Sequence, residues 1–218
     1  TAGLVFGGEG PGKDESEEYD GTSYTEGSDL TVGRAGVAGC GTQTAALAVG
    51  GYATTPVASA EEYDGTSWTA VTAMPAARYD PKGLGLQTAA LVTGGDNAAQ
   101  TDILATTLEY DGSSWTAGGD LLVKTRGHGT SGTQTAGLIM GGGQPDFTTN
   151  ASIYDGTSFV TAPSLATARA YFGDLAEGST TSAGLMSGGY NASNASIVTT
   201  EEFTGEVVTE TGSTIDFD

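Results

Sequence analysis

A repeat of 43 to 47 residues runs through the whole chain. A short apolar run followed by a glycine doublet occurs five times, and its leucines are 43, 44, 47 and 47 residues apart: Leu4, Leu47, Leu91, Leu138 and Leu185. A period of this length corresponds to one supersecondary unit that buries its apolar face against its neighbours. The chain is therefore expected to fold as five similar units.

Two further signals share this period. Tyr-Asp-Gly begins at residues 19, 63, 110 and 154, with a degenerate copy at 203, and five residues after each start stands Tyr24, Trp68, Trp115, Phe159 or Val208. An arginine then follows an apolar residue by four positions, as in Leu30 and Arg34, Met74 and Arg78, Leu122 and Arg126, and Leu165 and Arg169. Trp68, Trp115 and the four arginines are thus repeat positions, for which a structural role is expected.

Each unit is predicted to form four short strands, here called a, b, c and d. No stretch has helical periodicity, whereas threonine and aromatic residues favour strands. Strand b ends at the glycine doublet and strand c at Tyr-Asp-Gly, where Asp-Gly suits a tight turn. Four strands in this period predict an all-β fold, a single five-bladed β-propeller. The predicted units span about 1–32, 33–76, 77–124, 125–167 and 168–211, and residues 212–218 are expected to supply the strand a that the first unit lacks.

The repeat also resembles a known family. Gly-Gly, Tyr-Asp, Trp and then the run 74–78 (Met-Pro-Ala-Ala-Arg) look like the kelch repeat. Residues 42–47 (Thr-Gln-Thr-Ala-Ala-Leu) and 61–68 (Glu-Glu-Tyr-Asp-Gly-Thr-Ser-Trp) are also similar to small kelch-like propeller repeats common in marine bacteriophage and bacterial sequences. The resemblance implies kelch-like four-stranded blades and no single activity.

Composition excludes several functions. The formal net charge of −20 opposes contact with a nucleic-acid backbone, and no apolar run reaches the roughly 18 residues of a membrane helix. The only cysteine is Cys40, expected to be a buried inert thiol, and the only histidine is His128, expected on the pore side or the surface. A copper site like that of galactose oxidase, which needs two imidazoles, is excluded, and no metal or cofactor is expected. A calcium site in the stretch 15–20 or near Asp96 is the alternative.

The repeated charges favour structural roles. One arginine in each unit is expected to bond backbone carbonyls or an acidic side chain where units meet, and one glutamate of pairs such as Glu61-Glu62 and Glu201-Glu202 is a candidate partner. The alternative, a sialidase-like arginine cluster holding a substrate carboxylate, also requires Asp-boxes, and their aromatic spacing does not fit.

The variable segments are the b–c loops, at residues 9–16, 52–60, 96–106, 144–151 and 190–198. Strand alternation places all five at one end of the sheets with the d–a connections, and binding residues tend to lie on such loops. Aromatic and polar side chains that could contact a sugar are Tyr52, Asp96, Asn97, Phe147, Tyr190, Asn191 and Asn194. The alternative is that these side chains only brace their own loops.

The predicted function is a non-enzymatic binding or structural module. The phage-like resemblance implies a virion component, such as a tail-fibre, spike or decoration domain, that contacts host-surface glycan or neighbouring virion proteins and gains avidity in a homo-oligomer. The alternatives are a secreted or cell-surface bacterial adhesin and, third, a glycan-active enzyme. Only Asp80, Asp174 and Glu177 interrupt the repeat as possible catalytic acids of such an enzyme.

Overall fold

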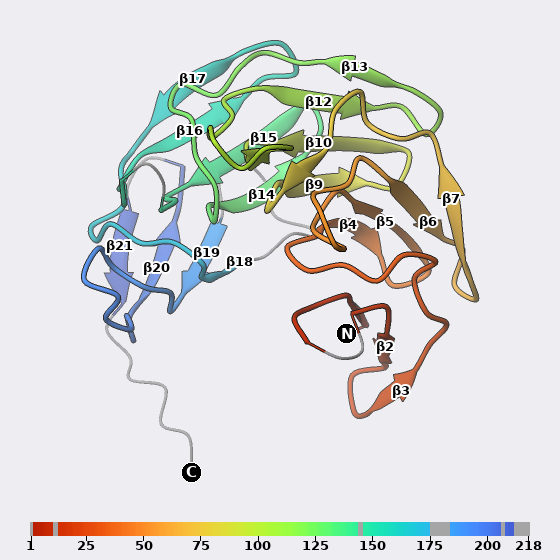
Figure 1. Ribbon diagram of the computed structural model, residues 1–218. Helices are drawn as coiled ribbons and strands as arrows, with labels where there is room; N and C mark the ends of the chain where they lie inside the picture. The colour runs from red at the N-terminus through yellow and green to blue at the C-terminus, as the bar shows by residue number, and fades with distance from the viewer. Residues whose placement is uncertain (1, 11–12, 144–145, 175–183, 206–207, 212–218) are drawn as a thin grey trace.

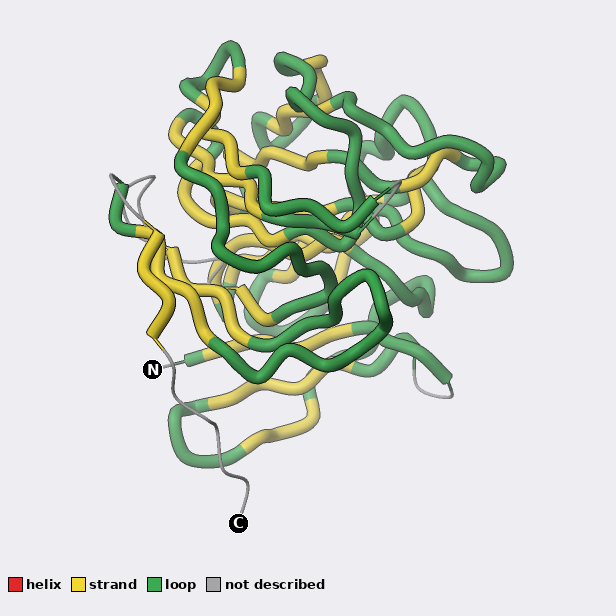
Figure 2. Tube along the Cα trace, turned by 90° about the vertical axis from the view of Figure 1, so that its left-hand side faces the viewer, coloured by secondary structure: helices red, strands yellow, loops and turns green. Residues whose placement is uncertain are grey.

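The computed structural model describes residues 2–10, 13–143, 146–174, 184–205 and 208–211. In this part of the chain the regular structure consists of β-strands, connected by loops and turns (Figure 2). The strands form several small antiparallel sheets, so the all-β prediction is confirmed. No helix among these residues has the length and apolar character needed to cross a membrane.

The first two sheets belong to the N-terminal third of the chain. One has three strands, β1 (Gly3–Phe6), β2 (Ser16–Tyr19) and β3 (Tyr24–Glu26). The next has four, β4 (Ala38–Thr42), β5 (Ala45–Val49), β6 (Ala60–Tyr63) and β7 (Trp68–Val71). Neighbours in the sheet are neighbours in the chain, as expected of strands a to d.

Three further four-stranded sheets follow the same order. The third sheet is made of β9 (Lys82–Leu86), β10 (Ala89–Thr93), β12 (Thr107–Tyr110) and β13 (Trp115–Ala117). The fourth contains β14 (Gly129–Thr133), β15 (Ala136–Met140), β16 (Ala151–Tyr154) and β17 (Phe159–Ala162). The fifth contains β18 (Gly173–Asp174), β19 (Gly184–Ser187), β20 (Thr200–Phe203) and β21 (Val208–Thr211). A short pair, β8 (Arg78–Tyr79) with β11 (Asp96–Asn97), joins a d–a connection to a b–c loop.

Consecutive sheets lie side by side in chain order, with β1–β3 and β18–β21 at the two ends of the series (Figure 1). From the second sheet onward, strand a of each sheet contacts strand a of the next, as β4 contacts β9, β9 contacts β14 and β14 contacts β18. Residues 212–218, predicted to complete the first sheet, lie outside the described part of the chain.

Apolar side chains fill the space between the sheets. Leu47, Leu91 and Leu138, which open the glycine-doublet runs, are fully buried, as are Tyr63 and Tyr110 of the Tyr-Asp-Gly sequences. The tyrosine rings pack against the aromatic residue five positions later, and Trp68 also contacts Phe6 of the preceding sheet. The aromatic repeat positions therefore build the core.

Two sets of polar side chains join one sheet to the next. Gln87 and Gln134, from the a–b turns, each donate to two backbone carbonyls of the preceding sheet at 2.8–3.0 Å. The Tyr110 hydroxyl donates to Glu62 of the preceding sheet at 3.0 Å, and the Tyr154 hydroxyl likewise donates to Glu109. The glutamate just before the Tyr-Asp-Gly tyrosine, Glu62 or Glu109, is thus an inter-sheet contact.

Candidate functional site

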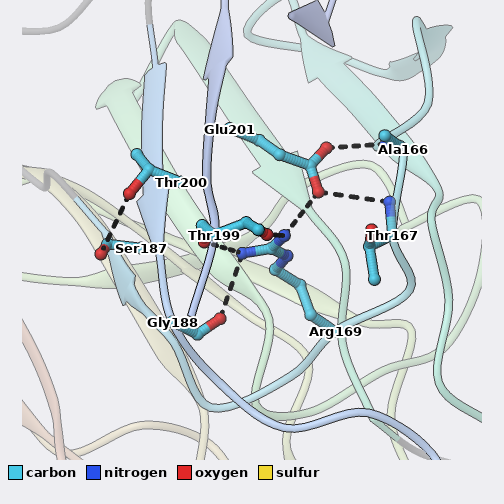
Figure 3. A network of polar contacts seen from close by, with 8 residues as sticks. All are labelled: Ala166, Thr167, Arg169, Ser187, Gly188, Thr199, Thr200 and Glu201. Carbon is cyan, nitrogen blue, oxygen red and sulfur yellow. Dashed lines mark hydrogen bonds and ion pairs between the residues drawn. The ribbon is translucent and has the colours of Figure 1, made fainter. Parts of the chain in front are cut away.

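Three of the repeat arginines brace the end of the sheets that carries the b–c loops and the d–a connections, called here the b–c end. Arg169 is fully buried, and its guanidinium donates to the carbonyls of Gly188 at 3.1 Å and Thr199 at 2.8 Å (Figure 3). It also pairs with buried Glu201 at 2.6 Å, and Glu201 accepts the backbone N–H groups of Ala166 and Thr167.

Arg34 and Arg78 have equivalent positions in earlier sheets. Arg34 donates to the Ser59 carbonyl at 3.0 Å and pairs with Glu61 at 2.8 Å. Arg78 donates to the carbonyls of Gly94 at 3.2 Å and Thr106 at 2.7 Å, and burial lowers the pKa of Arg78 to about 10. These three side chains therefore hold backbone groups of the scaffold.

Arg126 does not hold backbone carbonyls, and the predicted register of Leu122 with Arg126 is wrong, but its ion pair with Asp96 of the preceding unit is one of the two kinds of contact expected of the repeat arginines. The second glycine of each preceding doublet donates its N–H to the carbonyl of Arg34, Arg78 or Arg169, but in the fourth unit Gly95 donates to the carbonyl of Thr125. The buried apolar residue four positions earlier is shifted in the same way, because Leu121 is 6% exposed while Leu122 is 52% exposed. The true register is therefore Leu121 with Thr125, one residue earlier than the spacing of Leu122 and Arg126 suggested.

The shift gives Arg126 a different environment. Its side chain, 25% exposed, pairs with the carboxylate of Asp96, which directly follows a glycine doublet and is almost fully buried. Burial acts to lower the pKa of Arg126, but the neighbouring Tyr171 and Asp96 raise that pKa overall. Arg126 is thus a partly open cation at the b–c end.

A second carboxylate lies close by. Asp80 is buried and has a φ of 52°, a value that favours glycine; the corresponding residue of the second unit is Gly36, whose carbonyl accepts the Asp80 N–H at 3.1 Å. The Lys82 ammonium is 3.7 Å from the Asp80 carboxylate. Burial raises the pKa of Asp80, and Lys82 and Arg126 oppose this only in part.

Three tyrosines lie near these charges. Tyr52 packs edge-on against Tyr79, with ring centroids 5.8 Å apart, and Asp96 pairs with Tyr79 between β8 and β11. Tyr171 is 45% exposed, and its ring covers Gly127, where an added Cβ would meet it at 2.7 Å. Burial and then the charge of Asp80 raise the pKa of both Tyr79 and Tyr171, so these two rings and Asp80 belong to one electrostatic cluster.

A hollow of about 400 Å³ opens beside the Asp96–Arg126 pair. Its remaining lining comes from Lys124 and the loop segment 100–103, including Asp102, which pairs with Lys124 at 2.7 Å. Sites for small molecules have volumes of about 300–1,000 Å³. The cluster of Tyr79, Asp80, Asp96, Arg126 and Tyr171, together with this hollow, is called here the b–c end cluster.

The other predicted loop residues mostly brace their own loops. Asn97 exchanges hydrogen bonds with Thr101, and the Asn191 side chain accepts the N–H groups of Ser193 and Ala195. Phe147 is half-buried and lies near Gly143, whose added Cβ would meet its ring at 3.5 Å. Asn194 is exposed with a φ of 55°, and Tyr190 is 47% exposed. Of the seven predicted side chains, Tyr52 and Asp96 are thus at the cluster and Tyr190 is an open aromatic.

His128 is a buried scaffold residue, so the prediction of a pore-side or surface position is wrong. Its Nε2 is 2.8 Å from the Thr93 hydroxyl, and its ring lies against Gly94 as Val37, Pro81 and Phe172 lie against their own doublets. Burial lowers the pKa of His128 to about 3. Cys40 is also buried, and burial raises its thiol pKa to about 12.

Among the described residues, no three histidine, cysteine, aspartate or glutamate side chains come together as a metal site. Asp96, near which a calcium site was the alternative, pairs with Arg126 instead. Of the possible catalytic acids, Glu177 lies outside the described residues, Asp174 belongs to β18, and Asp80 belongs to the b–c end cluster.

The fold and the cluster define an all-β repeat protein whose exceptions to the repeat gather at one end. No family model matches the chain, and no curated protein matches it. Sequence reasoning missed Tyr79, Arg126 and Tyr171 as members of the cluster. A signal for Tyr79 and Tyr171 was present, because each stands one or two residues after a repeat arginine, where the second unit has Ala35 and Gly36.

Proposed function

We propose that the chain is a five-bladed β-propeller with kelch-like blades that works as a non-enzymatic binding module. The repeat supports this proposal, as do the four-stranded sheets joined through their a strands. The b–c end cluster is its binding site, and the ligand is a glycan on a host surface.

One observation carries the choice of this end. The c–d turns at the opposite end are nearly identical, since Asp64, Asp111 and Asp155 each accept two backbone N–H groups of their own turn. The b–c end instead brings together unlike charged and aromatic side chains. Charge-assisted hydrogen bonds from Arg126 and an exposed ring at Tyr171 suit the polar and apolar faces of a sugar.

The experiment is a glycan array probed with the parent chain and with Arg126→Ala and Tyr171→Ala. Loss of a charge-assisted hydrogen bond is worth about 1.5–3 kcal/mol, so Arg126→Ala should weaken binding about tenfold or more. Asp64→Ala, at the opposite end, is the control and should bind like the parent. The proposal fails if no glycan binds, or if both b–c end variants bind like the parent.

We further propose that this module is a component of a phage virion, a tail fibre, spike or decoration, which also contacts neighbouring virion proteins. The support is the resemblance of its repeats to those of marine phage sequences. Tail genes beside its gene would agree with a virion component, whereas surface-secretion genes would favour a bacterial adhesin that uses the same end. Turnover of a polysaccharide that Asp80→Asn or Asp174→Asn abolishes would overturn the assignment as a non-enzyme.

A further inference from the structure

A cavity in the fourth unit lies where the second, third and fifth units hold an arginine side chain. Its volume is about 150 Å³, and Thr125, Gly141, Asn150 and Ser152 are among its lining residues. Thr125 is the counterpart of the scaffold arginines, because its carbonyl accepts the N–H of Gly95 as theirs accept from the preceding doublets. Ser152 pairs with β15 as Glu61 pairs with β5 and Glu201 with β19, so it replaces their carboxylate.

The same backbone groups bind a guanidinium in the other units. The pairs of carbonyls that accept from Arg78 and Arg169 belong to the first glycine of a doublet and to the residue before strand c. In the fourth unit these two residues are Gly141 and Asn150, which are also joined by an N–H to carbonyl bond of 2.8 Å. Each of the four arginines in the chain lies in the described residues and bonds elsewhere, so none of them reaches this carbonyl pair.

A carboxylate is not required for this kind of binding. In the third unit Leu108 stands at the position of Glu61, yet the Arg78 guanidinium is held by the two carbonyls and by the Thr106 hydroxyl at 2.9 Å. Two carbonyls and one hydroxyl therefore hold a buried guanidinium in this scaffold without a carboxylate bonded to it, and the charge of Asp120 also favours the cation. The fourth unit offers the same pair of carbonyls without the side chain.

The cavity can be reached from solvent. Leu122 and Val123 are 52% and 45% exposed, and both line it, so it extends to the surface of the d–a connection. An engineered apolar cavity of about 150 Å³ accommodates benzene, so a planar guanidinium on a short alkyl chain is of suitable size.

We propose that this cavity binds the guanidinium group of a ligand, either a small alkylguanidinium compound or an arginine side chain presented by a partner protein. The planar group donates to the carbonyls of Gly141 and Asn150, and the alkyl part lies against Leu121 and Leu122. This site is distinct from the b–c end cluster, and its assignment does not depend on glycan binding.

The test is an NMR titration of the ¹⁵N-labelled parent chain with millimolar ethylguanidinium, followed in ¹H–¹⁵N correlation spectra. Ethylammonium serves as the matched cation. Ethylguanidinium should shift the amide signals of residues 125, 141, 150 and 152 until the shifts reach a plateau at saturation of the site. Ethylammonium should not shift them. N-acetylarginine amide, tested in the same way, distinguishes the sources: its binding indicates an arginine of a partner, and binding of ethylguanidinium alone indicates a small compound. Shifts that are absent, or equal for ethylguanidinium and ethylammonium, overturn the proposal.

A variant provides a second measurement. Thr125→Arg places the repeat arginine in the cavity, and should raise the melting temperature by a few degrees and abolish the ethylguanidinium shifts. Thr116→Arg, on the exposed face of β13, adds the same charge outside the cavity and should leave the shifts unchanged. Undiminished binding of ethylguanidinium to a folded Thr125→Arg variant overturns the assignment of the site.

Discussion

Replacement of Arg34 by methionine tests the role of the buried ion pairs. The side chains of Arg34 and Glu61 are 0% and 1% exposed, so solvent does not screen their interaction. After Arg34→Met, the Glu61 carboxylate keeps only the Thr31 N–H, at 2.6 Å, among its described hydrogen bonds. Removal of one partner of a buried pair costs about 3–5 kcal/mol, because the other charge is left uncompensated.

Replacement of the other partner, Glu61, should cost less stability. In Glu61→Leu, the Arg34 guanidinium still has the Ser59 carbonyl, and Arg78 is held in this manner beside Leu108. We expect a loss of about 1–3 kcal/mol, typical of broken hydrogen bonds to a charged group. The double variant removes both charges and replaces them with apolar volume, so it should regain at least about 2 kcal/mol over Arg34→Met.

The assay is urea unfolding followed by tryptophan fluorescence, since Trp68 lies in the same sheet as Glu61, with circular dichroism as a second probe. Coincident transitions are needed before free energies of unfolding are compared. A cost of Arg34→Met below about 1 kcal/mol would refute the reasoning. So would a double variant whose loss equals the sum of the two single losses.

Three further predictions concern other buried groups. His128 has a folded-state pKa of about 3, against about 6.5 in the unfolded chain. Between these two values the unfolded chain binds a proton that the folded chain does not. The free energy of unfolding is therefore full above about pH 6.5 and falls by up to about 1.4 kcal/mol per pH unit toward pH 3. His128→Phe introduces the residue that stands at the equivalent position 172, and it should flatten this fall of stability in urea titrations. An unchanged slope would contradict the prediction. The Cys40 thiol, with a pKa of about 12, should react with a thiol reagent at pH 8 only in denaturant; rapid labelling of the native chain would show that it is accessible. Gln134→Ala removes hydrogen bonds to two backbone carbonyls and should cost about 1–3 kcal/mol in the same unfolding assay, whereas a loss near zero would show that this contact between sheets is dispensable.

The repetitive parts of the fold could be predicted because local chemistry decides them. Asp-Gly fixes a tight turn through the positive φ of glycine, as at Gly65 with a φ of 88°, and apolar runs before the doublets form the buried b strands. The exceptions could not be read in the same way. Leu121 and Leu122 are both apolar, and only packing decides which of them is buried and hence whether Thr125 or Arg126 takes the scaffold position.

The sequence by itself determined the period, the all-β class, the order of strands in each unit and the end of the sheets at which variation gathers. Tertiary structure alone decided the environment of each charge, because burial and hydrogen bonding depend on which backbone groups a side chain can reach. Arg169 reaches two carbonyls and a buried glutamate, whereas Arg126, displaced by one residue from that register, reaches Asp96 at the b–c end. The same displacement leaves the cavity beside Thr125. A shift of one residue is nearly invisible in a repeat of more than forty residues, but along a strand or tight connection it turns a side chain toward different neighbours.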